Sequence, residues 1–264
     1  MKEFYGEEYL LNGKSAKKIF SAVKDLPIID YHCHLNEKLI AQNAGFQTIG
    51  ELWLAGDHYK WRAMRLCGVG EEYITGKKSD REKFFAYAKI LPMLAGNPLY
   101  AWSHRELREL FAIKEPLNGE SAQRIWDKAN ERLKGLRPRD LLKKFGVEYV
   151  ATTDDPVSDL SAHGVYGGTK IAPTFRPDRL FSLEEDYIKQ LGASAGEEIS
   201  TLDNLLSAIE KRLNYFVVKG CKISDHGFEK FPHGYASYEE AKRLFERRAA
   251  LRAEEKDAFF GFLL

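Results

Sequence analysis

The stretch STLDNLLSAIEKRLNYFVVKGCKISD, residues 200–225, joins an amphipathic helix directly to a short apolar strand. Ser200 is placed to cap the helix, with Asp203 at the capping-box position, and Gly220 ends it before a strand begins at Cys221. The apolar residues of the helix follow the spacing of one face: Leu202, Leu205, Leu206, Ile209, Leu213, Phe216 and Val217. A helix that leads straight into a strand is half of a βαβ unit, which indicates an α/β fold with a parallel sheet.

Three earlier runs are typical of buried strands: residues 26–30 (LPIID), 147–153 (VEYVATT) and 170–175 (KIAPTF). Polar side chains follow each of the four predicted strands at once: Tyr31-His32-Cys33-His34, Thr152-Thr153-Asp154-Asp155, Arg176-Pro177-Asp178-Arg179 and Asp225-His226. Because catalytic groups in such folds gather at the carboxyl ends of the strands, we expect one functional site there. Asp154 and Asp155 would supply hydrogen-bond acceptors to it or cap the following helix.

Residues 36–146 show helical stretches, among them DREKFFAYAKIL and SAQRIWDKANERLKG, and no convincing strand pattern. Strands and helices alternate only before and after this segment. We therefore predict that residues 1–35 and 147–264 form one part of the fold, and that residues 36–146 form a helical insertion subdomain.

His32 and His34 stand two residues apart, directly after the first predicted strand. In an extended chain their side chains share one side, so the two imidazoles can converge on one cation while Cys33 faces away into the core. The pair predicts a divalent metal site, for which Zn²⁺ is the first choice. An ordinary strand-to-loop turn is the alternative interpretation.

The charge balance argues against two classes of binding partner, nucleic acids and acidic membranes. Lys plus Arg number 40 and Asp plus Glu 39, so a net charge of +1 gives no global field that would attract nucleic acid or an acidic membrane. The three cysteines form no CxxC motif, which suits a reducing compartment. The charged N-terminal residues do not resemble a signal peptide, and no run approaches the ~20 apolar residues of a membrane span. We expect a cytoplasmic protein.

Five motifs in order, DYHCHL, GDHYKWRAMRLCGV, TTDDP, TFRPDR and SDHG, resemble those of uronate (glucuronate) isomerases in the amidohydrolase superfamily. The resemblance runs from about Tyr5 to the last residues. It implies a (β/α)8 TIM barrel of the metal-dependent hydrolase type, with a large helical insertion after strand 1. It also implies a small-molecule uronate substrate, with interconversion of D-glucuronate and D-fructuronate, and of D-galacturonate and D-tagaturonate, through an enediol.

The resemblance assigns roles to the second motif. His58, Arg62 and Arg65 can share one helix face, which by itself is typical of a solvated charged surface. By resemblance, His58 and Tyr59 lie near the sugar. Tyr59 would then relay a proton, and His58 would hold a hydroxyl or act as acid and base.

Arg176 follows the third predicted strand. Its guanidinium can bind the carboxylate of a uronate through two hydrogen bonds, or form a salt bridge to Asp178. Asp225 and His226 have two interpretations as well: they order the metal shell or touch the substrate, or they belong to a turn closed by Gly227.

The number of strands falls short of a whole barrel, which needs eight. The four candidates lead us to expect that the chain holds only the first four βα units and corresponds to the N-terminal part of the family. By resemblance, an Asp of the last strand would complete the metal site and act as the base. Its absence would leave the site incomplete and a strand edge open, so we expect a homo-oligomer or a missing C-terminal half supplied by another chain.

Two other functions remain compatible with these residues. A metal-dependent hydrolase of the same superfamily would also use the His-x-His pair, although hydrolysis gives the segments around His58 and Arg176 no evident role. The short length is also compatible with a truncated, non-catalytic fragment.

Overall fold

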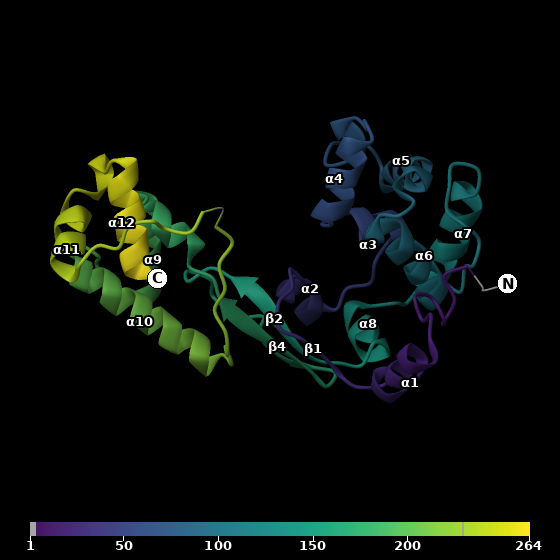
Figure 1. The fold of residues 1–264 in the computed structure, drawn as a ribbon, viewed down its shortest axis with the longest axis horizontal. Coiled ribbons are helices and arrows are strands. Elements are labelled where there is room, and N and C mark those ends of the chain that lie inside the picture. The colour runs from purple at the N-terminus through teal and green to yellow at the C-terminus, as the bar shows by residue number, and fades with distance from the viewer. Residues whose placement is uncertain (1–3, 229) are drawn as a thin grey trace. The chain divides into compact units, whose positions relative to one another are not determined.

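The computed structural model describes residues 4–228 and 230–264, and these form two compact units (Figure 1). The first unit comprises the described residues up to Leu26 together with Asn43–Leu141, and the second comprises Pro27–Gln42 and Leu142–Leu264. The predicted boundaries lie instead after residues 35 and 146, and they place residues 1–35 with the strands. The assignment of one part to a barrel and the other to an insertion stays a prediction.

Helices build the first unit. They are α1 (Lys14–Val23), α3 (Ile49–Leu54), α4 (His58–Leu66), α5 (Asp80–Ile90), α6 (Pro98–Phe111) and α7 (Ala122–Leu133), while α8 (Pro138–Lys144) spans the boundary between the units. Local sequence explains where several of them begin. Ser79 and Glu82 form a capping box at the start of α5, and Asp57 accepts hydrogen bonds from two backbone amides at the start of α4.

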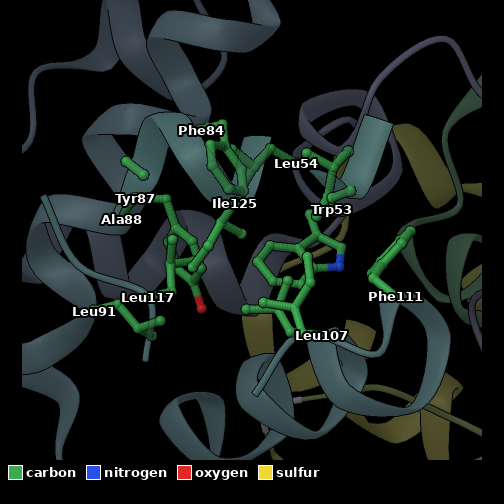
Figure 2. Close-up of a cluster of buried hydrophobic side chains, with 14 of the residues drawn as sticks. Trp53, Leu54, Phe84, Tyr87, Ala88, Leu91, Leu107, Phe111, Leu117 and Ile125 are labelled. Atoms are coloured by element: carbon green, nitrogen blue, oxygen red, sulfur yellow. The ribbon is translucent and has the colours of Figure 1, made fainter. Parts of the chain in front are cut away.

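An apolar cluster joins helices α3 to α7 of the first unit, and Figure 2 shows its side chains converging from several helices. Trp53 of α3, Phe84 and Tyr87 of α5, and Phe111 of α6 are at most 3% exposed. Burying an aromatic side chain of this kind contributes roughly 1.5–3 kcal/mol relative to leaving it in water. The helical character predicted for this part of the chain is confirmed.

The second unit contains a four-stranded sheet in the order β1-β2-β4-β3. Its strands are β1 (Ile28–Asp30), β2 (Val147–Asp154), β3 (Gly164–Tyr166) and β4 (Thr169–Phe175). The three predicted strands β1, β2 and β4 run parallel, whereas β3 is antiparallel to β4. Sequence reasoning missed β3, although Gly167 and Gly168, both at positive φ, form the two-residue turn that such a hairpin requires.

The fourth predicted strand is reduced to one parallel bridge between Phe175 and Ser224. Two backbone hydrogen bonds hold it, from Phe175 N to Ile223 O and from Asp225 N to Phe175 O, both 3.2 Å long. The result is an α/β fold with a small mixed sheet that is not closed, since β1 and β3 are its edges.

Four helices of the second unit follow the sheet along the chain and pack together: α9 (Glu185–Ala195), α10 (Leu202–Val218), α11 (Tyr238–Glu246) and α12 (Ala253–Leu263) (Figure 1). The short helix α2 (Glu37–Gln42) follows β1. The predicted cap of α10 is one residue off. Thr201, not Ser200, is the last extended residue, and its side chain accepts a hydrogen bond from Asn204 N. The Asn204 side chain in turn accepts a hydrogen bond from Thr201 N. Within the described residues, each helix is too short or too polar to pass through a bilayer.

Candidate functional site

The strand ends of the second unit bring four of the predicted segments together. Arg176 N donates to Asp154 O at 2.9 Å, which ties the end of β4 to the end of β2. The bridge at Ser224 brings Asp225 beside the same end of β4. Cys33 N donates to Ala151 O at 3.0 Å, which holds the histidine turn against β2. The expected gathering of polar groups at the carboxyl ends of the strands is therefore what parallel pairing produces.

The rings of His32 and His34 lie close together, with centroids 5.2 Å apart and planes 88° apart. Strand β1 ends at Asp30, so the pair lies in the turn beyond it, and both residues are exposed. Cys33 packs against the cluster that contains Val150 and Ile171, as expected for a side chain that faces away from the pair. Metal binding by the two histidines stays a prediction.

Asp225 stands beside this pair. One of its carboxylate oxygens lies against Nδ1 of His32, and the other lies 3.9 Å from Nε of Arg176. Both oxygens are shielded from solvent, and neither receives a hydrogen bond of ordinary geometry from the described residues. A carboxylate on one nitrogen of an imidazole orients the ring and leaves the other nitrogen available to a ligand.

Asp178 joins Arg176 to the segment after the Ser224 bridge. Its carboxylate accepts hydrogen bonds from Arg176 Nε at 2.8 Å and from Gly227 N at 2.7 Å, and it lies 3.1 Å from His226 Nδ1. We call Arg176, Asp178, Asp225, His226 and Gly227 the Arg176 cluster. Burial raises the pKa of the Asp178 carboxyl, but the hydrogen bonds from Arg176, Gly227 and His226 outweigh burial and hold that pKa below its ordinary value.

The predicted metal ligands are fewer than a catalytic zinc site needs. Across residues 4–228 and 230–264, no group of three or more His, Cys, Asp or Glu side chains is arranged to hold an ion. Catalytic zinc usually has three protein ligands, and His32 and His34 are two candidates.

His58 and Tyr59 belong to the first unit, in the first turn of α4. Their ring centroids are 4.4 Å apart, and Tyr59 is 56% exposed. Trp61 packs on the apolar cluster and donates from Nε1 to Leu54 O at 2.7 Å, so its side chain has a packing role. The predicted roles of His58 and Tyr59 on a sugar stay predictions.

Neither Asp154, the last residue of β2, nor Asp155 is the N-cap of a described helix. Asp155 Oδ1 accepts from Val157 N at 3.0 Å and from the Tyr187 hydroxyl at 2.9 Å. Arg179 lies 3.9 Å from Asp155 Oδ2 and places its guanidinium over the Tyr187 ring. These contacts fix the loop after β2 and give Arg179 a structural role.

Sequence reasoning missed a buried cluster formed by Thr152, Asp154 and His163. Thr152 Oγ1 donates to Asp154 Oδ2 at 2.6 Å and lies 2.8 Å from His163 Nε2. No spacing motif signals it, because the loop after β2 must return before His163 reaches the strand. His104 is also buried, with hydrogen-bond partners on both ring nitrogens, as expected for an ordinary core histidine.

Comparison with known proteins gives matches along the whole chain. The model of the glucuronate isomerase family matches residues 1–264. The uronate isomerase of Caldicellulosiruptor saccharolyticus is 44% identical over 95% of this chain and 56% of its own length. That of Geobacillus thermodenitrificans is 41% identical over 100% of this chain and 60% of its own length.

Solved structures agree with these matches. The crystal structure of uronate isomerase from Thermotoga maritima superposes with a TM-score of 0.94 at 39% identity, over 99% of this chain and 60% of that one. Glucuronate isomerase from Caulobacter crescentus gives a TM-score of 0.90 at 26% identity, over 98% and 59%. This chain thus spans between 56% and 60% of the length of these relatives. The predicted family is confirmed: the chain belongs to the glucuronate isomerase family.

Proposed function

We propose that the protein carries out aldose–ketose isomerisation of hexuronates, interconverting D-glucuronate with D-fructuronate and D-galacturonate with D-tagaturonate. The observation that carries this proposal is the match to one enzyme family along all 264 residues. The Arg176 cluster supports it, because a uronate differs from a neutral sugar by the carboxylate that an arginine recognises. Because this chain spans 56–60% of the length of these relatives, we propose the activity for a protein that covers the whole length of the family.

Arg176 is the proposed carboxylate ligand. Its side chain is 23% exposed, and Nε is engaged by Asp178, so the substrate would meet the terminal guanidinium nitrogens. Two parallel N–H···O bonds from a guanidinium fix the direction of a carboxylate as well as its position.

The reaction moves one proton from C2 to C1 through an enediol, with a matching proton shift between O1 and O2. Tyr59 is proposed to relay the proton on the oxygens, and His58 to hold a hydroxyl. By family resemblance, the base that takes the C2 proton is an Asp outside these 264 residues. Asp225 would hold His32 in the tautomer that carries the proton on Nδ1.

The metal remains part of the proposal. His32 and His34 would supply two ligands of a divalent ion, Zn²⁺ in the first instance, and a third would come from outside the 264 residues. When bound, such an ion polarises substrate oxygens or orients the carboxylate and its neighbouring hydroxyl. We also propose that the open sheet of the second unit is the first part of a (β/α)8 barrel, completed by further chain or by a partner.

The test is an assay of the full-length protein with D-glucuronate and D-galacturonate, in which ketose formation is measured directly. We expect both ketouronates, with kcat in the ordinary enzyme range of about 1–10³ s⁻¹. Release of acid from ester substrates without any ketose would instead favour a hydrolase. A protein that forms no ketose after metal is supplied would refute the proposal.

A further inference from the structure

Gly227 lies against the guanidinium of Arg176. A Cβ built on Gly227 would lie 1.5 Å from Nη2 and 2.7 Å from Cζ of Arg176, and 3.3 Å from Oδ2 of Asp178. The guanidinium therefore occupies the space that any side chain at position 227 would fill. Gly227 is not among the glycines with positive φ, so this position needs a glycine for space and not for backbone conformation.

Asp178 supplies the other side of this arrangement. One carboxylate binds the side chain of Arg176 through Nε and the backbone of the facing segment through Gly227 N. The guanidinium is planar, so a bond at Nε together with a wall at Gly227 restricts rotation about the last side-chain torsions. His226 contributes a third contact to the same carboxylate at 3.1 Å.

We propose that Asp178 and Gly227 together form a seat for the Arg176 guanidinium and are positioning residues for recognition of the substrate carboxylate. This inference rests on the proposed function, because it assigns the seat a role in binding a uronate. An arginine left free would lose the rotamer freedom of a long side chain on binding each substrate. The seat removes most of that loss in advance, which is preorganisation.

The clash at Gly227 falls on the end of a flexible side chain and not on backbone. Gly227→Ala should therefore displace the guanidinium and leave the fold intact. A carboxylate contact that is equally strong in ground and transition states contributes to KM and not to kcat. The seat predicts that its variants raise KM more than they lower kcat.

The experiment compares Gly227→Ala with the matched control Gly164→Ala in the full-length protein. At Gly164 an added Cβ meets only the Tyr166 ring at 3.8 Å, an ordinary contact in the same unit. We expect Gly227→Ala to raise KM for D-glucuronate about tenfold, with kcat within about twofold and unchanged thermal unfolding. Asp178→Asn should also raise KM, Asp178→Glu should restore part of it, and Gly164→Ala should match wild type. Wild-type KM in Gly227→Ala would overturn the inference.

A second readout separates this inference from the proposed function. The Nε–H of Arg176 should give a slowly exchanging ¹⁵N resonance, assigned by its loss in Arg176→Lys. Its exchange should accelerate in Gly227→Ala and Asp178→Asn and stay unchanged in Gly164→Ala. Unchanged exchange in both seat variants would overturn the seat even if the enzyme is active. Accelerated exchange in a protein that forms no ketose would refute the proposed function and leave the seat standing.

Discussion

Two clusters of charged and polar side chains stand at the same strand ends, and they differ in their access to water. In the closed cluster, Thr152 is 1% and Asp154 7% exposed, and the His163 side chain is 1% exposed. In the Arg176 cluster, the side chains of Arg176 and Asp178 are 23% and 26% exposed. Both clusters pair an acid with a basic side chain, but only the second is partly open to solvent.

Because of this difference in exposure, we expect the closed cluster to contribute to stability and the Arg176 cluster to bind a ligand. Polar groups shielded from water need partners inside the protein, because an unpaired one keeps its full desolvation cost. In the closed cluster, Thr152 Oγ1 has partners at 2.6 Å and 2.8 Å, whereas Nδ1 of His163 is buried without a hydrogen-bond partner among the described residues. The Arg176 cluster keeps charges that a dissolved anion can reach. Substitutions should therefore affect unfolding in the first cluster and substrate binding in the second.

The largest effect is expected from Arg176→Ala. Loss of a partly buried arginine that binds a carboxylate should lower kcat/KM for D-glucuronate by about 100-fold, which corresponds to ~3 kcal/mol. The free energy of unfolding should fall by less than about 1 kcal/mol, because the pair with Asp178 is partly exposed. Steady-state kinetics and urea unfolding measure the two effects. A large loss of stability with unchanged kinetics would contradict the role of Arg176 in substrate binding.

Asp154→Ala should have the opposite profile. It removes the acceptor of Thr152 and leaves His163 beside an empty space, which should lower the free energy of unfolding by about 2 kcal/mol. The control is Asp186→Ala, because Asp186 is 92% exposed and its pair with Lys189 is 4.0 Å long. Urea unfolding should show almost no change in the control. Equal stability of the two variants would show that the closed cluster does not contribute.

A smaller effect concerns pH. Because the folded protein holds the pKa of Asp178 below its ordinary value, this carboxylate adds stability above the unfolded pKa of about 3.9, and that stability is lost as pH falls through the folded pKa. The difference in stability between wild type and Asp178→Asn should therefore be largest at neutral pH and shrink below about pH 4. Unfolding in urea at a series of pH values measures it. A difference that grows on acidification would contradict the assigned hydrogen bonds.

The smallest effect concerns the chemical reactivity of the Cys33 thiol and involves no change in stability. Burial raises the pKa of the Cys33 thiol to about 11, so little thiolate forms at pH 8 although its neighbours His32 and His34 are exposed. Iodoacetamide should modify Cys33 far more slowly in the folded protein than in urea, which peptide mass spectrometry can follow. Rapid modification of the folded protein would show that the histidine turn opens and exposes the packed side of Cys33.

Much of the fold follows from local pattern. Strands β1, β2 and β4 are short apolar runs bounded by polar residues, and α10 shows the periodicity of one buried face. Strand β3 lacks such a run, and only its Gly-Gly turn marks it. The strand expected at Cys221 has the right composition but pairs at Ser224 alone, because pairing depends on neighbours that local sequence does not reveal.

The sequence predicts the positions of residues that directly follow the end of a strand. It does not predict contacts between residues that a long loop brings together. The His32 and His34 pair and the position of Arg176 follow from strand ends. The contact between Arg176 and Gly227 joins residues 51 positions apart through a loop, and the approach of His163 to Thr152 depends on how the loop after β2 folds back. Such contacts are set by tertiary packing, which residue spacing alone does not encode.

Recognition of the substrate carboxylate by the seated Arg176 is central to the proposed function. The direct measurement is the affinity of the full-length protein for D-glucuronate and for D-glucuronamide, in wild type and in Arg176→Ala. We predict that wild type prefers the acid over the amide by at least tenfold and that Arg176→Ala loses this preference, because only the acid carries the charge that the guanidinium binds. A preference that is the same in both proteins would contradict the account.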